Sequence, residues 1–569
     1  MDPEALQVMD VTSLKAVVTD LRQIILPSRF EKAQQPEPGT IQIGLRTLRG
    51  LIWIEISWKA EAPRLVQISS PIRIGSESTL AKQIQHGLNK MALIEIQQNG
   101  FERVVMFCLA QRPGAPIERT LVIELMGRHS NLLLLENQEK IITLGRQVSN
   151  QQSRIRPIGT GDIYALPPAL QGKEPNSSES FKTWKDRLTL IPCKLKRALH
   201  DTYQGISPSL NLQLADDRIE KASELLDLYV TEISEVEWRK LYRRWQCWLE
   251  KLENESLEIS FNGPTDFRLW DTCSQEEDTS KNLSLILGKY YREKLESKRL
   301  IMLTKELEKR ILKIKLNEEK HLLNQEELLK KTSENKSLQE KADELLCMPS
   351  PDRRIINQAQ KLYQRAKKLR RSNPIIKERI FYHEKRLEAI EESSSFLENL
   401  STNSWEESSE KLEILIALRQ ELDEFETTLK RNKKNKKSSA LHKNQLPQPL
   451  LLKSPGGLEI QIGRNHRQNE WISLHKSRTG DIWFHVQECP GSHVVLKASN
   501  GLAEELDIQI AADLAAFFSR ANGNQRVAVL MVPTDNLHRI PGMPAGTVRH
   551  RQGSVCWGEP SRGLQYIKS

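Results

Sequence analysis

The stretch "GDIWFHVQECPGSHVVL", residues 480–496, decides how the last part of this chain folds. It contains His485, Cys489 and His493, whose four-residue spacing would align three metal ligands on one face of a helix. A Pro-Gly pair between the last two interrupts a helix, and in "IWFHVQ" the side chains alternate with the period of a strand. We therefore predict strand, turn and strand, an arrangement that would scatter the three ligands, and we expect no metal site.

The surrounding residues, 441–569, extend this pattern of short strands. Further strands are expected near 458–462, 471–474 and 527–532. The segment "DIQIAADLAAFFSRAN" (507–522) has the spacing of a helix, and its alanines allow close packing on a sheet. The sequence thus predicts a compact C-terminal α/β domain.

Residues 283–440 have a different composition, rich in Lys, Glu and Leu and poor in Gly. Apolar side chains recur every three or four residues until "CMPSPDRR" (347–354) interrupts them, and the pattern then resumes. We predict a long antiparallel coiled-coil hairpin, with arms of about sixty to seventy residues and on the order of 90–100 Å each. The basic stretch "KRNKKNKK" (430–437) would be a linker.

One helical stretch of the second arm, "KLYQRAKKLRR" (361–371), contains six cations and no acidic residue. These cations are Lys361, Arg365, Lys367, Lys368, Arg370 and Arg371. A solvated helix face usually mixes in glutamates, so contact with phosphate groups and an ordinary solvated surface both stay open.

The first 282 residues combine two kinds of pattern. Residues 1–165 contain a helix pattern at 10–25 and strand patterns at 50–58, 119–127 and 131–145, which predicts a mixed α/β domain. Residues 166–282 are mainly helical, and "GISPSL" (205–210) interrupts the helices. The predicted fold class is therefore a multidomain α+β chain.

Composition limits the classes of function. The 569 residues contain 84 Lys and Arg against 74 Asp and Glu, a net charge of +10 that suits a polyanionic partner. The seven cysteines form no Cys-x-x-Cys pair, which is typical of reduced thiols in a cytoplasmic protein. The start, "MDPEALQVMD", lacks an apolar core, so we expect no signal peptide, and no run is apolar enough to predict a membrane span.

Several motifs together resemble the NFACT family, which includes bacterial RqcH, once called fibronectin-binding protein A, and the eukaryotic nuclear export mediator factor. The resemblance is densest in "LEIQIGRNHRQNEWISLHKSRTGDIWFHVQECPGSHVVLK" (458–497), which is similar to the C-terminal NFACT-R domain. "LMGRHSNLLLLE" (125–136) resembles the N-terminal signature, "GISPSL" the helix-hairpin-helix module, and "NQAQKLYQRAKKLRR" (357–371) the start of the second coiled-coil arm. The motifs occur in the family's order along essentially the whole chain.

This resemblance implies a ribosome quality-control factor. Such a protein binds an obstructed large ribosomal subunit that carries peptidyl-tRNA, recruits an aminoacyl-tRNA, typically alanyl-tRNA in bacteria, and promotes template-free C-terminal tailing of the stalled nascent chain. It would have no catalytic residues and no cofactor, because the ribosome makes the bond, and it would act in the cytoplasm without a membrane partner.

The resemblance also implies particular contacts. In the N-terminal domain, the expected tRNA-binding residues are Asp10, Glu102, Arg103 and Arg128. The expected RNA-binding residues are Lys367, Lys368, Arg370 and Arg371 in the hairpin, and Arg464, Asn465, Arg467, Trp483, His485, Ser492 and His493 in the C-terminal domain. Trp483, His485 and Gln487 share one strand face that could stack on nucleotides, although a packed tryptophan and satisfied core histidines are the ordinary alternative.

The sequence departs from the family at positions that contribute to tRNA binding and tailing in active members. Active members carry an Asp-Arg pair at the position of Glu102-Arg103, and the extra methylene displaces the carboxylate by about 1 Å or more. A nearby Arg-Lys pair is replaced by Gln85-His86. An RNA- or ribosome-binding factor without tailing activity is therefore one alternative, and an adhesin-like fibronectin-binding protein is another. A DNA glycosylase is disfavoured, because Pro3 would not become the N-terminal residue on removal of Met1 and no zinc-finger cysteine set follows.

Overall fold

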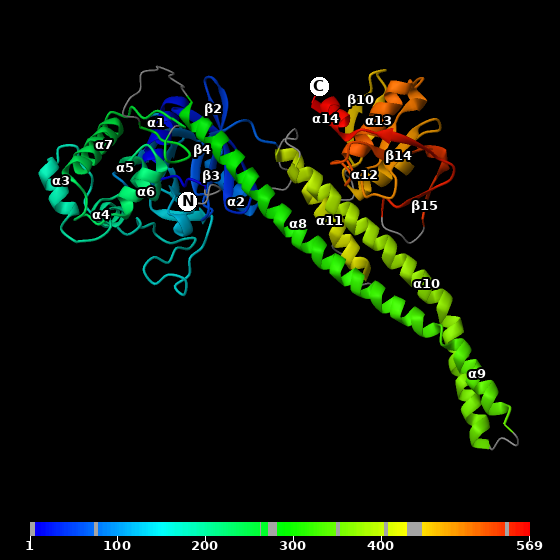
Figure 1. Ribbon diagram of the computed structural model, residues 1–569. Coiled ribbons are helices and arrows are strands. Elements are labelled where there is room, and N and C mark those ends of the chain that lie inside the picture. Colours follow the sequence, from blue (N-terminus) through cyan, green and yellow to red (C-terminus); the bar gives the residue numbers. More distant parts are fainter. Residues whose placement is uncertain are drawn as a thin grey trace. The chain divides into compact units, whose positions relative to one another are not determined.

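A computed structural model describes residues 6–72, 78–261, 263–270, 282–348, 353–402, 408–429, 447–540 and 545–568. The chain divides into two compact units, Met1–Leu295 and Glu296–Ser569 (Figure 1), and each is considered by itself. The predicted basic linker at 430–437 lies outside the described residues.

The first unit contains a nine-stranded sheet in the order β4-β3-β2-β1-β5-β6-β7-β8-β9, and all neighbours are antiparallel. The strands are β1 (Ser28–Glu37), β2 (Thr40–Thr47), β3 (Gly50–Ser57), β4 (Arg64–Ile68), β5 (Ala92–Gln98), β6 (Val104–Ala110), β7 (Arg119–Glu124), β8 (Asn131–Glu136) and β9 (Lys140–Leu144). The strands and the hairpin predicted between 50 and 145 are confirmed.

The helices that pack on this sheet include the first helix of the chain and a short helix after β4. α1 (Val11–Ile25) buries the apolar stripe of Leu14, Val17 and Leu21 in the same core as the strands, as its helical spacing predicted. α2 (Thr79–Leu88) begins at the cap residue Ser78, whose hydroxyl accepts from the Ala81 amide, and it packs beside β1 and β9.

A helical subdomain follows in the same unit. Its helices are α3 (Phe181–Leu188), α4 (Leu195–Thr202), α5 (Pro208–Ala215), α6 (Ile219–Asp227) and α7 (Glu235–Glu253). "GISPSL" forms the turn between α4 and α5 and the first residues of α5. The core of the subdomain is aromatic, and its fully buried members include Trp184, Trp238, Trp245, Trp248 and Trp270.

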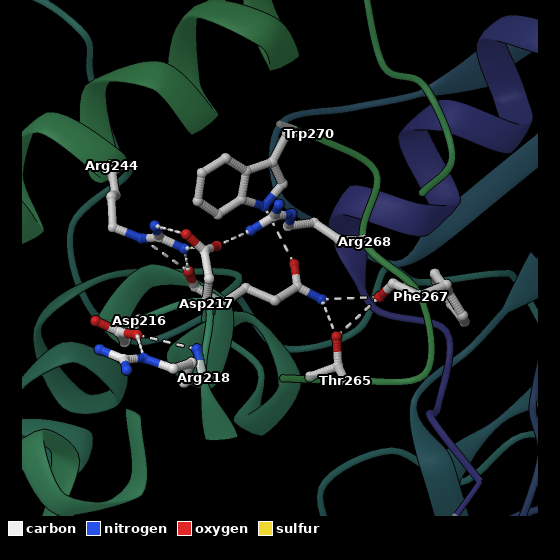
Figure 2. A network of polar contacts seen from close by, with 9 residues as sticks. Asp216, Asp217, Arg218, Arg244, Thr265, Phe267, Arg268 and Trp270 are labelled. Carbon is white, nitrogen blue, oxygen red and sulfur yellow. Dashed lines mark hydrogen bonds and ion pairs between the residues drawn. The ribbon is translucent and has the colours of Figure 1, made fainter. Parts of the chain in front are cut away.

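An ion-pair cluster fastens the segment after α7 to this subdomain (Figure 2). The Asp217 carboxylate pairs with Arg244 at 2.9 and 3.1 Å and with Arg268 at 2.5 Å. Both guanidinium groups lie over the ring of Trp270, at 5.7 and 5.6 Å from its centroid. Hydrogen bonds from Arg244 and Arg268 lower the pKa of Asp217 to about 2 against the opposing effect of burial, so the carboxylate stays charged.

The helical hairpin belongs mainly to the second unit. α8 (Leu283–Thr332) starts in the first unit and continues into the second, where α9 (Asn335–Leu346) completes the first arm. α10 (Arg353–Thr402) forms the antiparallel second arm. A buried ion pair sets their register, since Glu318, only 1% exposed, accepts from Arg386 at 3.0 Å and lies 2.8 Å from a ring nitrogen of His383.

The second arm is shorter than predicted. α10 has 50 residues, or about 75 Å, and the remaining apolar repeat forms a separate helix, α11 (Ser408–Leu429). α11 packs beside both other helices: Leu415 and Leu418 share a core with Leu307 of α8 and Leu397 of α10. The base of the hairpin is therefore a three-helix bundle, because a third apolar stripe covers the side that two helices leave exposed.

The C-terminal domain has a six-stranded antiparallel sheet in the order β10-β11-β13-β12-β14-β17. The strands are β10 (Leu450–Lys453), β11 (Glu459–Ile462), β12 (Ile482–Val486), β13 (Val494–Leu496), β14 (Val527–Pro533) and β17 (Ser554–Gly558). One face packs on α13 (Glu505–Phe517) and the terminal helix α14 (Pro560–Lys568). The predicted strand, turn and strand of residues 480–496 is confirmed.

The other face of this sheet has a cover of its own. It consists of α12 (His466–Glu470) with the π-helical turn Trp471–His475, and of a two-stranded ribbon, β15 (Leu537–Arg539) and β16 (Val548–His550). The strand predicted at 471–474 is therefore wrong: the Asn465 side chain accepts from the Gln468 amide and caps a helix there. No helix in the described part of the chain combines the length and apolar content needed to cross a membrane.

Candidate nucleic-acid interface

Asp10 is the cap of α1. Its Oδ1 accepts from the Ser13 amide at 2.9 Å and from the Ser13 hydroxyl at 2.6 Å, while its Oδ2 accepts from the Ser207 hydroxyl at 2.7 Å. The residue is only 8% exposed. Both carboxylate oxygens are thus occupied inside the protein, and in this structure Asp10 positions the start of α1 and the turn that contains Ser207.

Three segments that are distant in the sequence meet at this point. Gly205, with φ of +78°, lies so close to Phe101 and Val11 that an added Cβ would be 2.8 Å from each side chain. Phe101 in turn packs against Trp248, with ring centroids 6.2 Å apart. The turn between α4 and α5 is therefore packed against the start of α1 and the 99–103 loop, and its Gly205 faces protein side chains.

Arg103 follows Phe101 in that loop and is half-buried. Burial lowers the pKa of Arg103, and the negative charges of Asp10 and Glu102 oppose that effect. Among the described residues, its guanidinium forms no hydrogen bond or ion pair, whereas Arg64 and Arg156 of the same unit are both paired. A half-buried guanidinium with unused donors is suited to a phosphate group from outside the chain.

Glu102 adjoins Arg103 in the loop, and Arg128 follows β7, the strand that pairs with β6. The Glu102 carboxylate accepts weakly from the Leu170 amide, at 3.3 Å, and lines a pocket of about 180 Å³ between β5, β6 and residues 166–169. Arg128 is exposed in the 3-10 turn Gly127–His129, just beyond the point where the Leu125 amide donates to the Arg103 carbonyl at 2.9 Å. The four predicted residues thus comprise one internal cap, Asp10, and three residues at one end of the β6–β7 pair.

The predicted basic stretch of the hairpin lies on α10. All six of its cations are exposed, and none forms an ion pair within the described part of the chain. Lys361, Arg365 and Lys368 follow at intervals of four and three residues and so occupy one stripe, while Arg370 lies about 180° around the helix from Lys361. This surface has an unbalanced positive charge, in contrast to the paired Arg310 and Lys315 at the base of the hairpin.

The segment "GRNHRQN" (463–469) makes contacts within the second unit. The Asn469 Oδ1 accepts from the His493 amide at 3.1 Å, and the Gln468 Oε1 accepts from the Arg464 amide at 2.8 Å. Arg467 is half-buried and forms an ion pair with Glu424 of α11. Of two predicted RNA contacts in this segment, Asn465 is therefore buried as a helix cap, whereas Arg467 is partly exposed and has one nitrogen paired with Glu424.

His466, between them, joins the domain to the hairpin. Its ring lies 2.8 Å from the Ser393 hydroxyl and 3.3 Å from the Glu392 carboxylate, and its amide donates to Glu421 at 3.2 Å. Burial alone would lower the pKa of His466, but Glu392 and Glu421 raise it above its ordinary value. Neither glutamate was singled out from the sequence, because their role depends on a contact between segments tens of residues apart.

The face predicted to stack on nucleotides is mostly covered at β12. Trp483 is 3% exposed, with its ring stacked on His485 at 5.5 Å and at right angles to His493 at 5.0 Å. Burial lowers the pKa of His485 and brings that of His493 well below the ordinary range, so both rings are neutral. Ser492 is 2% exposed. The packed tryptophan that sequence analysis left as an alternative is what the structure shows.

The predicted scattering of the three possible metal ligands is wrong for the two histidines. The rings of His485 and His493 lie 5.3 Å apart, because β12 and β13 are adjacent strands. Cys489 lies in the connecting turn and packs toward the core on the opposite face of the sheet. In the described residues no group of three or more His, Cys, Asp and Glu side chains could hold a metal ion.

Comparison with known proteins agrees with this architecture. A family model for the NFACT N-terminal and middle domains matches residues 10–350, more than half of the chain. The chain belongs to the NFACT family. A second model, for the NFACT protein RNA binding domain, matches residues 450–552.

Alignments with related proteins cover most of the length of this NFACT protein. The "Rqc2 homolog RqcH" of Streptococcus suis is 24% identical over 562 residues, which is 95% of each chain. The protein of the same name from Bacillus subtilis is 25% identical and covers 83% of each chain. Among solved structures, the C-terminal part of the fibronectin/fibrinogen-binding protein of Streptococcus suis is 25% identical, with a TM-score of 0.38, and covers 48% of this chain and 98% of that one.

Proposed function

We propose that this NFACT protein is a ribosome quality-control factor that binds an obstructed large ribosomal subunit and holds a tRNA with its N-terminal domain. The exposed, unpaired cations of α10 support subunit binding most directly, because they lie on a helical arm that extends beyond the three-helix base. Relatives named RqcH that align over about 95% of the chain support the same assignment. rRNA phosphates are the expected ligands of these cations.

The unpaired guanidinium of Arg103 supports the second part of the proposal. It is half-buried with unused donors, a setting in which a bidentate phosphate contact would be specific in position. In this scheme, the carboxylate of Asp10 keeps the start of α1 and the turn that contains Ser207 in place, and Glu102 and Arg128 border the bound tRNA.

The finer steps are also part of the proposal. The bound tRNA would be an aminoacyl-tRNA, with alanyl-tRNA as the first candidate, and the product would be a template-free tail on the stalled nascent chain. The ribosome would supply the chemistry in the cytoplasm, so the protein itself would need neither a catalytic residue nor a cofactor. Binding without tailing is the alternative, and the specific observation in its favour is Glu102 in place of the family's aspartate.

Sedimentation with purified large ribosomal subunits tests the binding step. Lys361→Gln with Lys368→Gln removes two charges from one stripe of α10, and the charge-matched control, Lys309→Gln with Lys313→Gln, removes two exposed charges from α8 at the three-helix base. If the stripe contacts two phosphates, the slope of log K against log salt falls by about 1.4–1.8 for the first pair. Equal, unchanged sedimentation of both variants and wild type would exclude the stripe as the contact.

Recovery of tRNA with the subunit-bound protein tests the second step. Arg103→Ala should lose tRNA while subunit binding persists, because Arg103 lies in the first unit and the α10 cations in the second. Arg119→Ala, which removes a half-buried arginine already paired with Glu136, is the control. If Arg103→Ala retains tRNA at the wild-type level, the guanidinium is not the contact. Tail length on a stalled reporter, for wild type and Glu102→Asp, separates tailing from binding alone.

A further inference from the structure

One end of the sheet face opposite α13 is exposed. The pairing of β14 with β17 places Trp557 beside Ala528 and Val555 beside Leu530. These pairs lie on the same face as the covered Trp483, because Leu530 also pairs with His485 of β12. Yet Trp557 is 59% exposed and Val555 53% exposed, since the cover of α12 and the β15–β16 ribbon leaves the edge strand β17 open.

Two cations without partners precede this exposed part in the chain. Arg549 and Arg551, which precede β17 in the chain, are exposed and form no ion pair or side-chain hydrogen bond with any described residue. Gly553 brings the connecting segment down onto the same face, since an added Cβ there would lie 3.0 Å from Val532 and 3.3 Å from Leu530. Positive charge and an exposed indole therefore occur together within nine residues of the chain.

The strand that carries the indole is held firmly. Gly558, the last residue of β17, leaves no room for a side chain against the Ala512 carbonyl of α13. The side-chain amide of Gln509 donates to the Trp557 carbonyl at 2.7 Å, and the backbone amide of Glu559 donates to the Asp513 carboxylate at 2.7 Å. Because the backbone of this strand is already ordered, a ligand that stacks on the indole has only the side chain left to order.

We propose that Trp557, Val555, Arg549 and Arg551, the β17 platform, bind an unpaired segment of RNA. A base stacks on the indole of Trp557 against the neighbouring Val555, and the two arginines hold phosphate groups of the same strand. Aromatic side chains beside unpaired cations fit single-stranded RNA, whose bases are free to stack, better than a duplex, whose bases are not. This proposal rests on the proposed function, and it places the contact partly beyond the residues 450–552 of the RNA-binding family model.

The test uses the full chain with a fluorescein-labelled twelve-nucleotide oligouridine and, in parallel, a duplex of the same length. Trp557→Ala is expected to weaken oligouridine binding about 5- to 150-fold, the effect of one stacked base, and Trp557→Phe to restore most of it. Arg551→Ser should lower the salt slope by about 0.7, as expected for one phosphate of a single strand. The duplex should bind more weakly, and Trp557→Ala should leave its binding unchanged.

Two controls guard against general effects. Leu502→Ala removes another exposed apolar side chain of the domain, 95% exposed, and Arg520→Ser removes an exposed arginine just after α13, so both should bind like wild type. Oligouridine binding by Trp557→Ala within twofold of wild type would overturn the platform, and so would an equal loss in Leu502→Ala.

Subunit sedimentation of the same variants distinguishes this proposal from the function on which it rests. If wild type binds neither subunits nor oligouridine, the proposed function fails and the platform with it. If wild type binds both and Trp557→Ala is normal for both, only the platform fails. If Trp557→Ala loses subunits but keeps oligouridine, the platform contacts a ribosomal protein instead, which also overturns the proposal.

Discussion

Replacement of Asp481 by Asn tests whether the segment "DIWFHV" (481–486) stabilises the C-terminal domain or binds RNA. Asp481 precedes β12 and is 0% exposed. Its carboxylate accepts from the Arg478 amide at 2.8 Å and from the Ser499 amide and hydroxyl at 3.1 and 2.6 Å. It also forms an ion pair with Lys497, whose side chain is only 6% exposed.

The size of the effect follows from these contacts. Without the carboxylate, the ammonium group of Lys497 keeps its charge in a buried site, and loss of one partner of a buried ion pair costs about 3–5 kcal/mol. The Asn amide oxygen can still accept from some of the same donors, so we expect a value near the lower limit, about 3 kcal/mol. The double variant Asp481→Asn with Lys497→Met should recover about 1–2 kcal/mol, because it removes the unpaired charge.

The pH dependence has a definite sign. Burial alone would raise the pKa of Asp481, but hydrogen bonds from Lys497 and Ser499 lower it below the ordinary value of 3.8. The carboxylate therefore stabilises the domain fully above that value, and its contribution is lost as the pH falls below it. The difference between wild type and Asp481→Asn should shrink over the same range.

Hydrogen exchange of peptides from residues 480–496 in the full chain is the appropriate assay, because a chain with two units has no single free energy of unfolding. Asp535→Asn, which removes an exposed carboxylate, is the matched control and should exchange like wild type. A change below about 1 kcal/mol in Asp481→Asn would refute the reasoning. Loss of RNA binding without a change in exchange would show that Asp481 supports RNA binding by some means other than the stability of the domain.

Two further predictions concern other buried charges and histidines. Glu318→Gln removes the carboxylate that pairs with the buried Arg386, so exchange of α8 and α10 peptides should accelerate as for a loss of about 3–5 kcal/mol. Unchanged exchange would mean that Glu318 does not stabilise the register. Burial holds the pKa of His493 well below its ordinary value of 6.5, so the unfolded chain takes up a proton that the folded one does not. The C-terminal domain should therefore have its full stability above pH 6.5 and become less stable below it. A stability that stays constant down to pH 5 in wild type would contradict the low pKa of His493. An equal decrease of stability in His493→Gln would contradict it as well.

The sequence by itself determined the elements with a strong local period. The 3.6-residue spacing of Leu14, Val17 and Leu21 located α1, and the alternation in 50–58 and 480–496 located β3 and the β12–β13 pair. The same local signals indicated a helical hairpin and its basic stretch at 361–371. Such patterns depend only on residues a few positions apart, so they can be recognised without knowledge of the rest of the fold.

Only the tertiary structure decided which of these side chains are available to a ligand. Trp483 and Trp557 lie on one sheet face, yet residues 466–475 and the strands β15 and β16 cover the first and leave the second exposed. Asp10 is internally bonded through Ser207, whereas Arg103 is left without a partner in the described part of the chain. Burial and pairing depend on contacts between residues far apart in the sequence, so they cannot be predicted from the spacing of residues along the chain.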